Sequence, residues 1–79
     1  MNITYTMNDQ ENDYRSMYVT DMKKTAFIGK GCQISVCLMN SSHRCWRGPG
    51  KSFQSFADAK QYYKSGFMQA AIALAEQTL

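Results

Sequence analysis

The chain has few of the features that build disulfide frameworks, membrane spans and secretion signals. Its three cysteines, Cys32, Cys37 and Cys45, are an odd number, which is typical of reduced thiols. No apolar run approaches the roughly 18 residues of a membrane-spanning helix. The amino-terminal residues lack the basic region and apolar core of a signal peptide. We therefore expect a cytoplasmic protein that does not enter the membrane.

A single histidine limits the metal and catalytic sites that the chain can form. Cys32, Cys37, His43 and Cys45 fit structural zinc poorly, because Cys32 and Cys37 are expected on opposite faces of one strand. Cys32 is instead expected to face the core as a small hydrophobic residue. A thiol nucleophile beside His43 would lack a third, orienting group. The sequence thus predicts no catalytic residue, no metal site and no cofactor, and we expect a protein that is not an enzyme.

The size and composition indicate one folded domain. Its 79 residues leave room for a small core, and a hydrophobic content of 44% with 13% aromatics is too high for a disordered chain. The net charge of +3 is unevenly divided, because residues 1–22 carry −3 and residues 23–64 carry +7. This division could steer a partner of either sign, or let the acidic part fold back onto the basic part.

Apolar and polar residues alternate with a period of two in the first part of the chain, which predicts strands. The predicted strands are Asn2–Met7, Tyr14–Thr20, Thr25–Ile28, Cys32–Met39 and the shorter His43–Arg47. Short strands joined by tight turns indicate antiparallel pairing. Residues 1–47 are therefore expected to be rich in strands, and residues 48–54, which contain Gly48-Pro49-Gly50, to form a loop.

The last third of the chain has the pattern of an amphipathic helix. Ser55 is suited to cap its start, and one apolar stripe keeps its phase across Ser65-Gly66, which predicts a single helix over residues 55–78. The fold class is α+β, an antiparallel sheet of four or five strands with one long C-terminal helix packed on one face. The expected core consists of Val19, Phe27, Ile34, Val36, Leu38, Phe53, Phe56, Tyr63, Phe67, Ala70 and Leu74.

A second apolar series lies on another side of the predicted helix. It comprises Met68, Ala71, Ile72, Ala75 and Leu79. Because a helix on one sheet buries only one stripe, this series needs a further cover. The alternatives are the chain's own N-terminal segment, a second copy in a homodimer, or a foreign partner, and the last two make Met68 and Ile72 contact residues.

The clearest surface signal is the stretch from His43 to Lys51, in which Arg44, Arg47 and Lys51 flank the only tryptophan, Trp46. Tryptophan and arginine are the residue types that most often dominate protein interfaces. The same residues could meet phosphates while Trp46 stacks on an unpaired base. A third alternative is that Trp46 packs inward against the helix while the charges provide solubility.

Gly48-Pro49-Gly50-Lys51-Ser52, followed by a helix with Ala70-Ala71 and Leu74, resembles the glycine-rich loop and closing helix of double-stranded RNA-binding domains. The resemblance covers the last 30 residues. The chain has Ala57-Asp58 where that family has a basic pair at the helix start, and its N-terminal residues have a strand pattern. We therefore assign no RNA-contacting positions.

Together these patterns predict a small non-enzymatic module that binds a protein partner and occludes its surface. Arg44, Trp46, Arg47 and Lys51 are the expected contact patch, with Met68 and Ile72 as a second patch or a homodimer seam. Small proteins of this kind are common among phage and mobile-element inhibitors of host machinery, including anti-CRISPR proteins. The alternative is a nucleic-acid-binding module that uses the same basic-aromatic patch.

Overall fold

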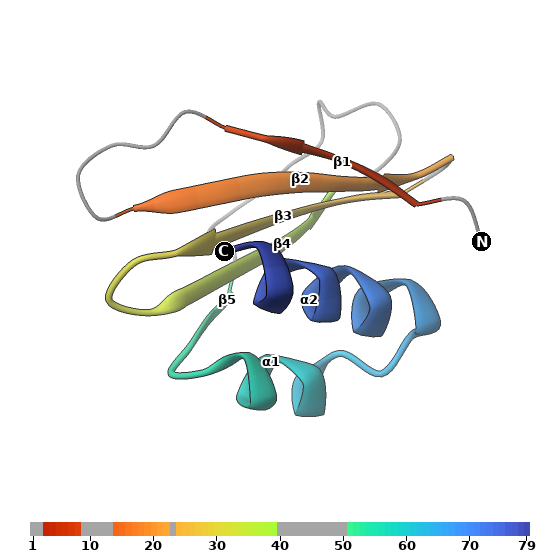
Figure 1. Cartoon of the computed structure of the whole chain (residues 1–79). Coiled ribbons are helices and arrows are strands. Elements are labelled where there is room, and N and C mark those ends of the chain that lie inside the picture. The colour runs from red at the N-terminus through yellow and green to blue at the C-terminus, as the bar shows by residue number, and fades with distance from the viewer. Residues whose placement is uncertain (1–2, 9–13, 23, 40–50) are drawn as a thin grey trace.

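The computed structural model describes residues 3–8, 14–22, 24–39 and 51–79. These residues form a five-stranded sheet and two helices (Figure 1). The strands are β1 Thr4–Met7, β2 Arg15–Asp21, β3 Lys24–Lys30, β4 Ile34–Met39 and β5 Lys51–Phe53, and the helices are α1 Phe56–Tyr62 and α2 Gly66–Thr78. The predicted α+β class, with an antiparallel sheet and the helical layer after it, is confirmed.

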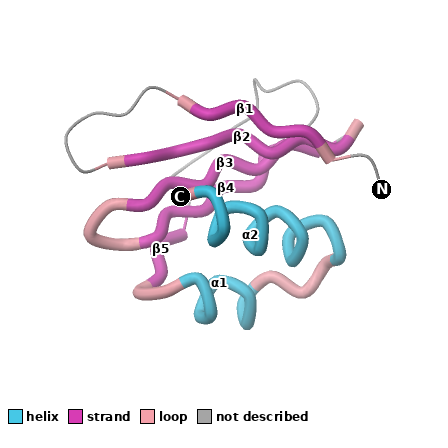
Figure 2. The backbone as a smooth tube through the Cα atoms, in the orientation of Figure 1, coloured by secondary structure: helices cyan, strands magenta, loops and turns pink. Residues whose placement is uncertain are grey.

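The sheet is a meander, with strand order β1-β2-β3-β4-β5 and antiparallel pairing throughout. Alternate residues therefore face the same side of the sheet across several strands. One such row joins Met7, Met17, Ile28, Val36 and Lys51 through successive pairings. The backbone tube in Figure 2 shows both helices on the same side of this sheet.

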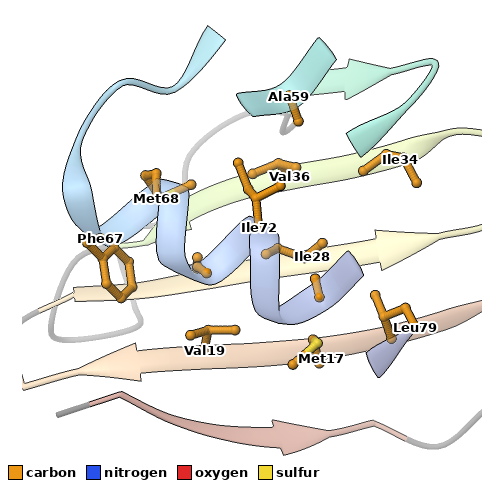
Figure 3. Packing of buried hydrophobic residues seen from close by; sticks show 13 residues of the cluster. Met17, Val19, Ile28, Ile34, Val36, Ala59, Phe67, Met68, Ile72 and Leu79 are labelled. Carbon is orange, nitrogen blue, oxygen red and sulfur yellow. The ribbon is translucent and has the colours of Figure 1, made fainter. Parts of the chain in front are cut away.

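The core lies between that face of the sheet and the helices. Met17 and Val19 from β2, and Ala26 and Ile28 from β3, are fully buried. The longer helix, α2, packs on β2 and β3, and α1 packs on β4 and β5. Figure 3 shows Phe67 and Met68 near one end of α2 and Leu79 at the other. The guanidinium of Arg15 donates to the Leu79 carbonyl at 3.0 Å, which ties the C-terminal residue to β2.

The prediction of a single helix over residues 55–78 is wrong, because the chain leaves the helix at Tyr63 and starts a new one at Gly66. Tyr63 has an extended ψ of 116°, and Ser65 has an extended ψ of 153° and accepts a hydrogen bond from the Met68 amide through its hydroxyl. Ser65 is thus a second N-cap. The Ser65 capping bond and Gly66 at the first helical position start a new helix here, although the apolar stripe keeps its phase across these residues.

The break also changes which stripe of α2 faces the sheet. The buried residues of α2 are Phe67, Met68, Ala71, Ile72 and Ala75, with Leu79 buried after its end. The second apolar series is therefore the stripe of α2 that faces the core. Of the three alternatives for its cover, the chain itself covers it, through β2 and β3. Ala70 and Leu74 lie at its margin, each partly exposed.

The predicted core is confirmed for Val19, Ile34, Val36 and Phe67, which are buried. The partly buried residues that pack against the core are Phe53, Phe56, Tyr63 and Leu74. Leu38 is 50% exposed, so its core assignment is wrong. Phe27 lies on the opposite face of the sheet, where its ring meets Tyr18 edge-on at a centroid distance of 5.4 Å.

The predicted loop over residues 48–54 contains a short strand, β5, whose Phe53 pairs with Ile34 and whose Lys51 pairs with Val36. The predicted strand His43–Arg47 lies outside the described residues. Among the described residues, no helix is long and apolar enough to cross a membrane.

Candidate functional site: a basic-aromatic surface on β5 and α1

The predicted contact residues fall into three groups. Arg44, Trp46 and Arg47 lie outside the described residues. Lys51 is exposed at the start of β5. Met68 and Ile72 are 2% and 0% exposed, so their side chains belong to the core of the chain and present no contact surface.

Lys51 stands over an aromatic cluster, formed by Phe53, Tyr62 and Tyr63. Its ammonium nitrogen lies 4.9 Å from the centroid of the Tyr62 ring, which is cation–π geometry. The ring centroids are 5.7 Å apart for Phe53 and Tyr62, 5.9 Å for Phe53 and Tyr63, and 4.8 Å for Tyr62 and Tyr63. We call these four residues the basic-aromatic surface.

The sheet register explains why this surface forms. Lys51 and Phe53 alternate with Ser52, so both side chains lie on the helix-bearing face of β5, the same face as their partners Val36 and Ile34. From there they meet the last turn of α1, where Tyr62 and Tyr63 follow each other. Phe53 and Tyr63 are half-buried, whereas Tyr62 is 53% exposed. The cluster therefore has a packed base and one ring available to a partner.

The end of α1 is held by an amide from α2. The side-chain nitrogen of Gln69 donates to the Lys60 carbonyl at 2.6 Å and also to the Tyr63 carbonyl. Both acceptors belong to the last turn of α1, where carbonyls lack helical partners. The ion pair between Lys60 and Glu76, at 2.6 Å, joins the same two helices at the surface. Gln69 thus binds the end of α1 that carries Tyr62 and Tyr63.

The electrostatics of the surface combine the exposed Lys51 ammonium with the half-buried phenol of Tyr63. Burial raises the pKa of Tyr63 above its ordinary value of 10.0, and the nearby Tyr62 and Cys37 raise it further. The Tyr63 hydroxyl therefore stays protonated at neutral pH and can donate a hydrogen bond. Lys60, the lysine of α1, forms an ion pair with Glu76, which balances its charge.

Lysines elsewhere in the described structure do not extend this surface into a continuous track. Lys24 and Lys30 occupy the two ends of β3, about 20 Å apart along the strand. Lys64 is exposed in the link between the helices. Isolated cations of this kind fit a polynucleotide backbone less well than a groove lined with them.

The thiols are arranged differently from the sequence prediction. Cys32 lies in the turn between β3 and β4 and is exposed, so the expectation that it faces the core is wrong. Cys37 is buried on the face of β4 away from the helices. His43 and Cys45 lie outside the described residues. Within the ranges that the structure describes, no three His, Cys, Asp or Glu side chains gather as a metal site.

Tyr62 is the site residue that sequence reasoning missed. The predicted helical stripe does not include it, and the sequence pattern predicts a loop around Lys51. A signal was present in retrospect, because alternation places Lys51 and Phe53 on one face, and an aromatic pair follows at the end of the next helix. What the sequence does not contain is the packing that brings them together.

Comparison with protein-family models, curated proteins and solved structures finds no match to this chain.

Proposed function

We propose that this protein binds another protein through the basic-aromatic surface and acts by covering part of that partner. The observation that supports the proposal is the exposed Tyr62 ring, held between the Lys51 ammonium and the packed Phe53 and Tyr63 rings. Tyrosine is one of the residue types most often enriched in protein-interface hot spots. The cation favours a partner with an acidic surface.

The sequence extends the proposed contact beyond the described residues. Arg44, Trp46 and Arg47 precede Lys51 by a few positions, and on sequence grounds they remain proposed members of the contact patch. An inhibitor of the type that phages and mobile elements encode, such as an anti-CRISPR protein, would act by this kind of occlusion. Nucleic-acid binding by the same patch is the alternative, and the scattered lysines of the described structure make it the weaker one.

The test is an affinity capture from lysate with tagged wild-type protein and three variants, at low and high salt, with and without nuclease. Tyr62→Ala removes the exposed ring, and Lys51→Glu reverses the cation. Lys24→Glu makes the same change of charge on an exposed lysine at the start of β3 and serves as the matched control. Circular dichroism establishes that each variant is folded.

We expect one protein complex that survives high salt and nuclease, is lost with Tyr62→Ala and Lys51→Glu, and persists with Lys24→Glu. With the purified partner, Tyr62→Ala should weaken binding by about tenfold or more, as for an interface hot spot. Recovery of nucleic acid that disappears steeply with salt would refute the protein-binding proposal and favour the alternative. If Lys24→Glu and Lys51→Glu reduced capture of the partner equally, binding would depend on the net charge of the protein and not on the position of Lys51.

A further inference from the structure

The β1 edge of the sheet has the features of an interface. β1 is the first strand in the order, so its outer side has no strand partner among the described residues (Figure 1). Thr4, Tyr5 and Thr6 are exposed, and Tyr5 is 49% exposed. The segment from Ile3 to Met7 contains no charge, proline or glycine. Exposed edges usually carry such residues because they prevent pairing with another chain.

The opposite edge differs in charge. Its strand β5, with three residues, is about as short as β1, with four, but it begins with an exposed lysine, Lys51. A lysine is one of the ordinary protections of a sheet edge. The β5 edge thus carries a charged residue, whereas the β1 edge carries none.

The hydrogen-bond phase of β1 determines which groups face outward. The Asn8 amide donates to the Ser16 carbonyl at 3.0 Å, which continues the pairing of Met7 with Met17. In an antiparallel ladder, residues alternate between pairs that exchange backbone bonds and pairs that do not. Asn8 and Thr6 therefore direct their N–H and C=O groups toward β2, and Tyr5 and Met7 direct theirs to the open edge.

The side chains around Tyr5 read nearly the same in both directions, as Ile3-Thr4-Tyr5-Thr6-Met7. A second copy, antiparallel and related by a two-fold axis at Tyr5, would place Tyr5 opposite Tyr5, Thr4 opposite Thr6 and Ile3 opposite Met7. Each pair joins residues of similar chemistry. In this register, residues whose backbone N–H and C=O groups point to the open edge lie opposite each other in the two copies. They can form about six hydrogen bonds between the copies.

We propose that the β1 edge binds a second copy of this chain through this two-fold pairing. A two-fold interface must be complementary to itself, and the near-palindromic segment meets that condition, which a foreign strand would not require. The two sheets become one sheet of ten strands with the helices of both copies on the same side, because Tyr5 faces the same side in each. The two basic-aromatic surfaces then lie at opposite ends, about 43 Å apart measured across the strands.

This pairing is a different homodimer from one through the end of α2. Met68 and Ile72 are buried within the chain, so they provide no seam. The contact between two short edge strands is small, and we expect a dissociation constant in the range of about 10 µM to 1 mM.

Sedimentation equilibrium over that range tests the proposal with charge-swapped variants at the axis. Tyr5→Lys and Tyr5→Glu each place like charges directly opposite one another and should weaken self-association about tenfold or more. An equimolar mixture should associate again, because lysine then faces glutamate. Tyr62→Lys replaces an equally exposed tyrosine at the other end of the sheet and should leave self-association unchanged.

A second measurement uses the wild-type protein and does not depend on the folding of any variant. Amide hydrogen exchange should show protection of the Tyr5 and Met7 amides that rises with protein concentration, while the Thr6 amide is protected at every concentration. The proposal is overturned by a chain that stays monomeric to about 1 mM. It is also overturned by self-association that Tyr5→Lys leaves intact, by a mixture that does not reassociate, or by a foreign strand held at β1 while the chain is monomeric.

Discussion

Replacing Ile72 with alanine tests whether the second apolar series of α2 is core or contact surface. Ile72 is fully buried and points from α2 toward the strands that carry Ile28 and Val36 (Figure 3). The substitution removes three carbons, worth about 2.4 kcal/mol at about 0.8 kcal/mol each. The residual cavity adds to this, and we expect a loss of about 3 to 4 kcal/mol in the free energy of unfolding.

That loss is large for this chain, because 79 residues are expected to give a stability of about 4 to 12 kcal/mol. Urea denaturation followed by far-ultraviolet circular dichroism measures it, and the midpoint should fall by about 2 M. Ile72→Val removes one carbon and serves as the control, with an expected loss of about 1 kcal/mol. A loss below about 1 kcal/mol for Ile72→Ala would refute the core assignment, because a residue on a contact surface gives little to the stability of the monomer.

Three further substitutions test other contacts. Gln69→Ala removes the amide that holds the end of α1 and should cost about 1 to 2 kcal/mol in urea denaturation, whereas Gln77→Ala, on the exposed side of the same helix, should cost less than about 0.5 kcal/mol. Because the pKa of Tyr63 is raised in the folded state, the unfolded chain loses that proton first. Stability should be independent of this group below pH 10 and fall as the pH rises above it, and Tyr63→Phe should remove that part of the pH dependence. A methyl group at Gly29 would clash with the Tyr14 hydroxyl, so Gly29→Ala should displace the ring and cost about 1 kcal/mol, but should be neutral or stabilising in a Tyr14→Ala background. Equal effects of Gly29→Ala in the two backgrounds would contradict that contact.

The sheet was predictable because strand alternation is a local property. Four of the five observed strands overlap predicted ones, and their antiparallel order follows from the short turns between them. β5 was not predictable in the same way. Its three residues, Lys51–Phe53, are too few for their alternation to predict a strand, and the strand is defined by its pairing with the edge of β4.

The helical region shows how one local signal can outweigh a longer one. The apolar stripe through Phe67 and Leu74 kept its phase across Ser65-Gly66, and this phase predicted a single helix. The Ser65 hydroxyl and the Met68 amide nevertheless form a cap, and Gln69 binds the carbonyls at the end of α1. The second interaction joins residues six to nine positions apart and depends on the helices already being packed, so sequence periodicity does not contain it.

The two proposed surfaces lie on opposite edges of one sheet, and this placement makes them separable. β1 and β5 are separated by the three central strands, and the described structure has no packing contact between β1 and α1. Tyr5→Lys should therefore leave the Lys51–Tyr62 pair intact, and Tyr62→Ala should leave the β1 ladder intact, since neither residue supports the other's neighbours. If a partner presents two acidic sites, the dimer holds both surfaces on one rigid sheet, and the loss of self-association would lower the apparent affinity for that partner without changing any contact in the interface itself.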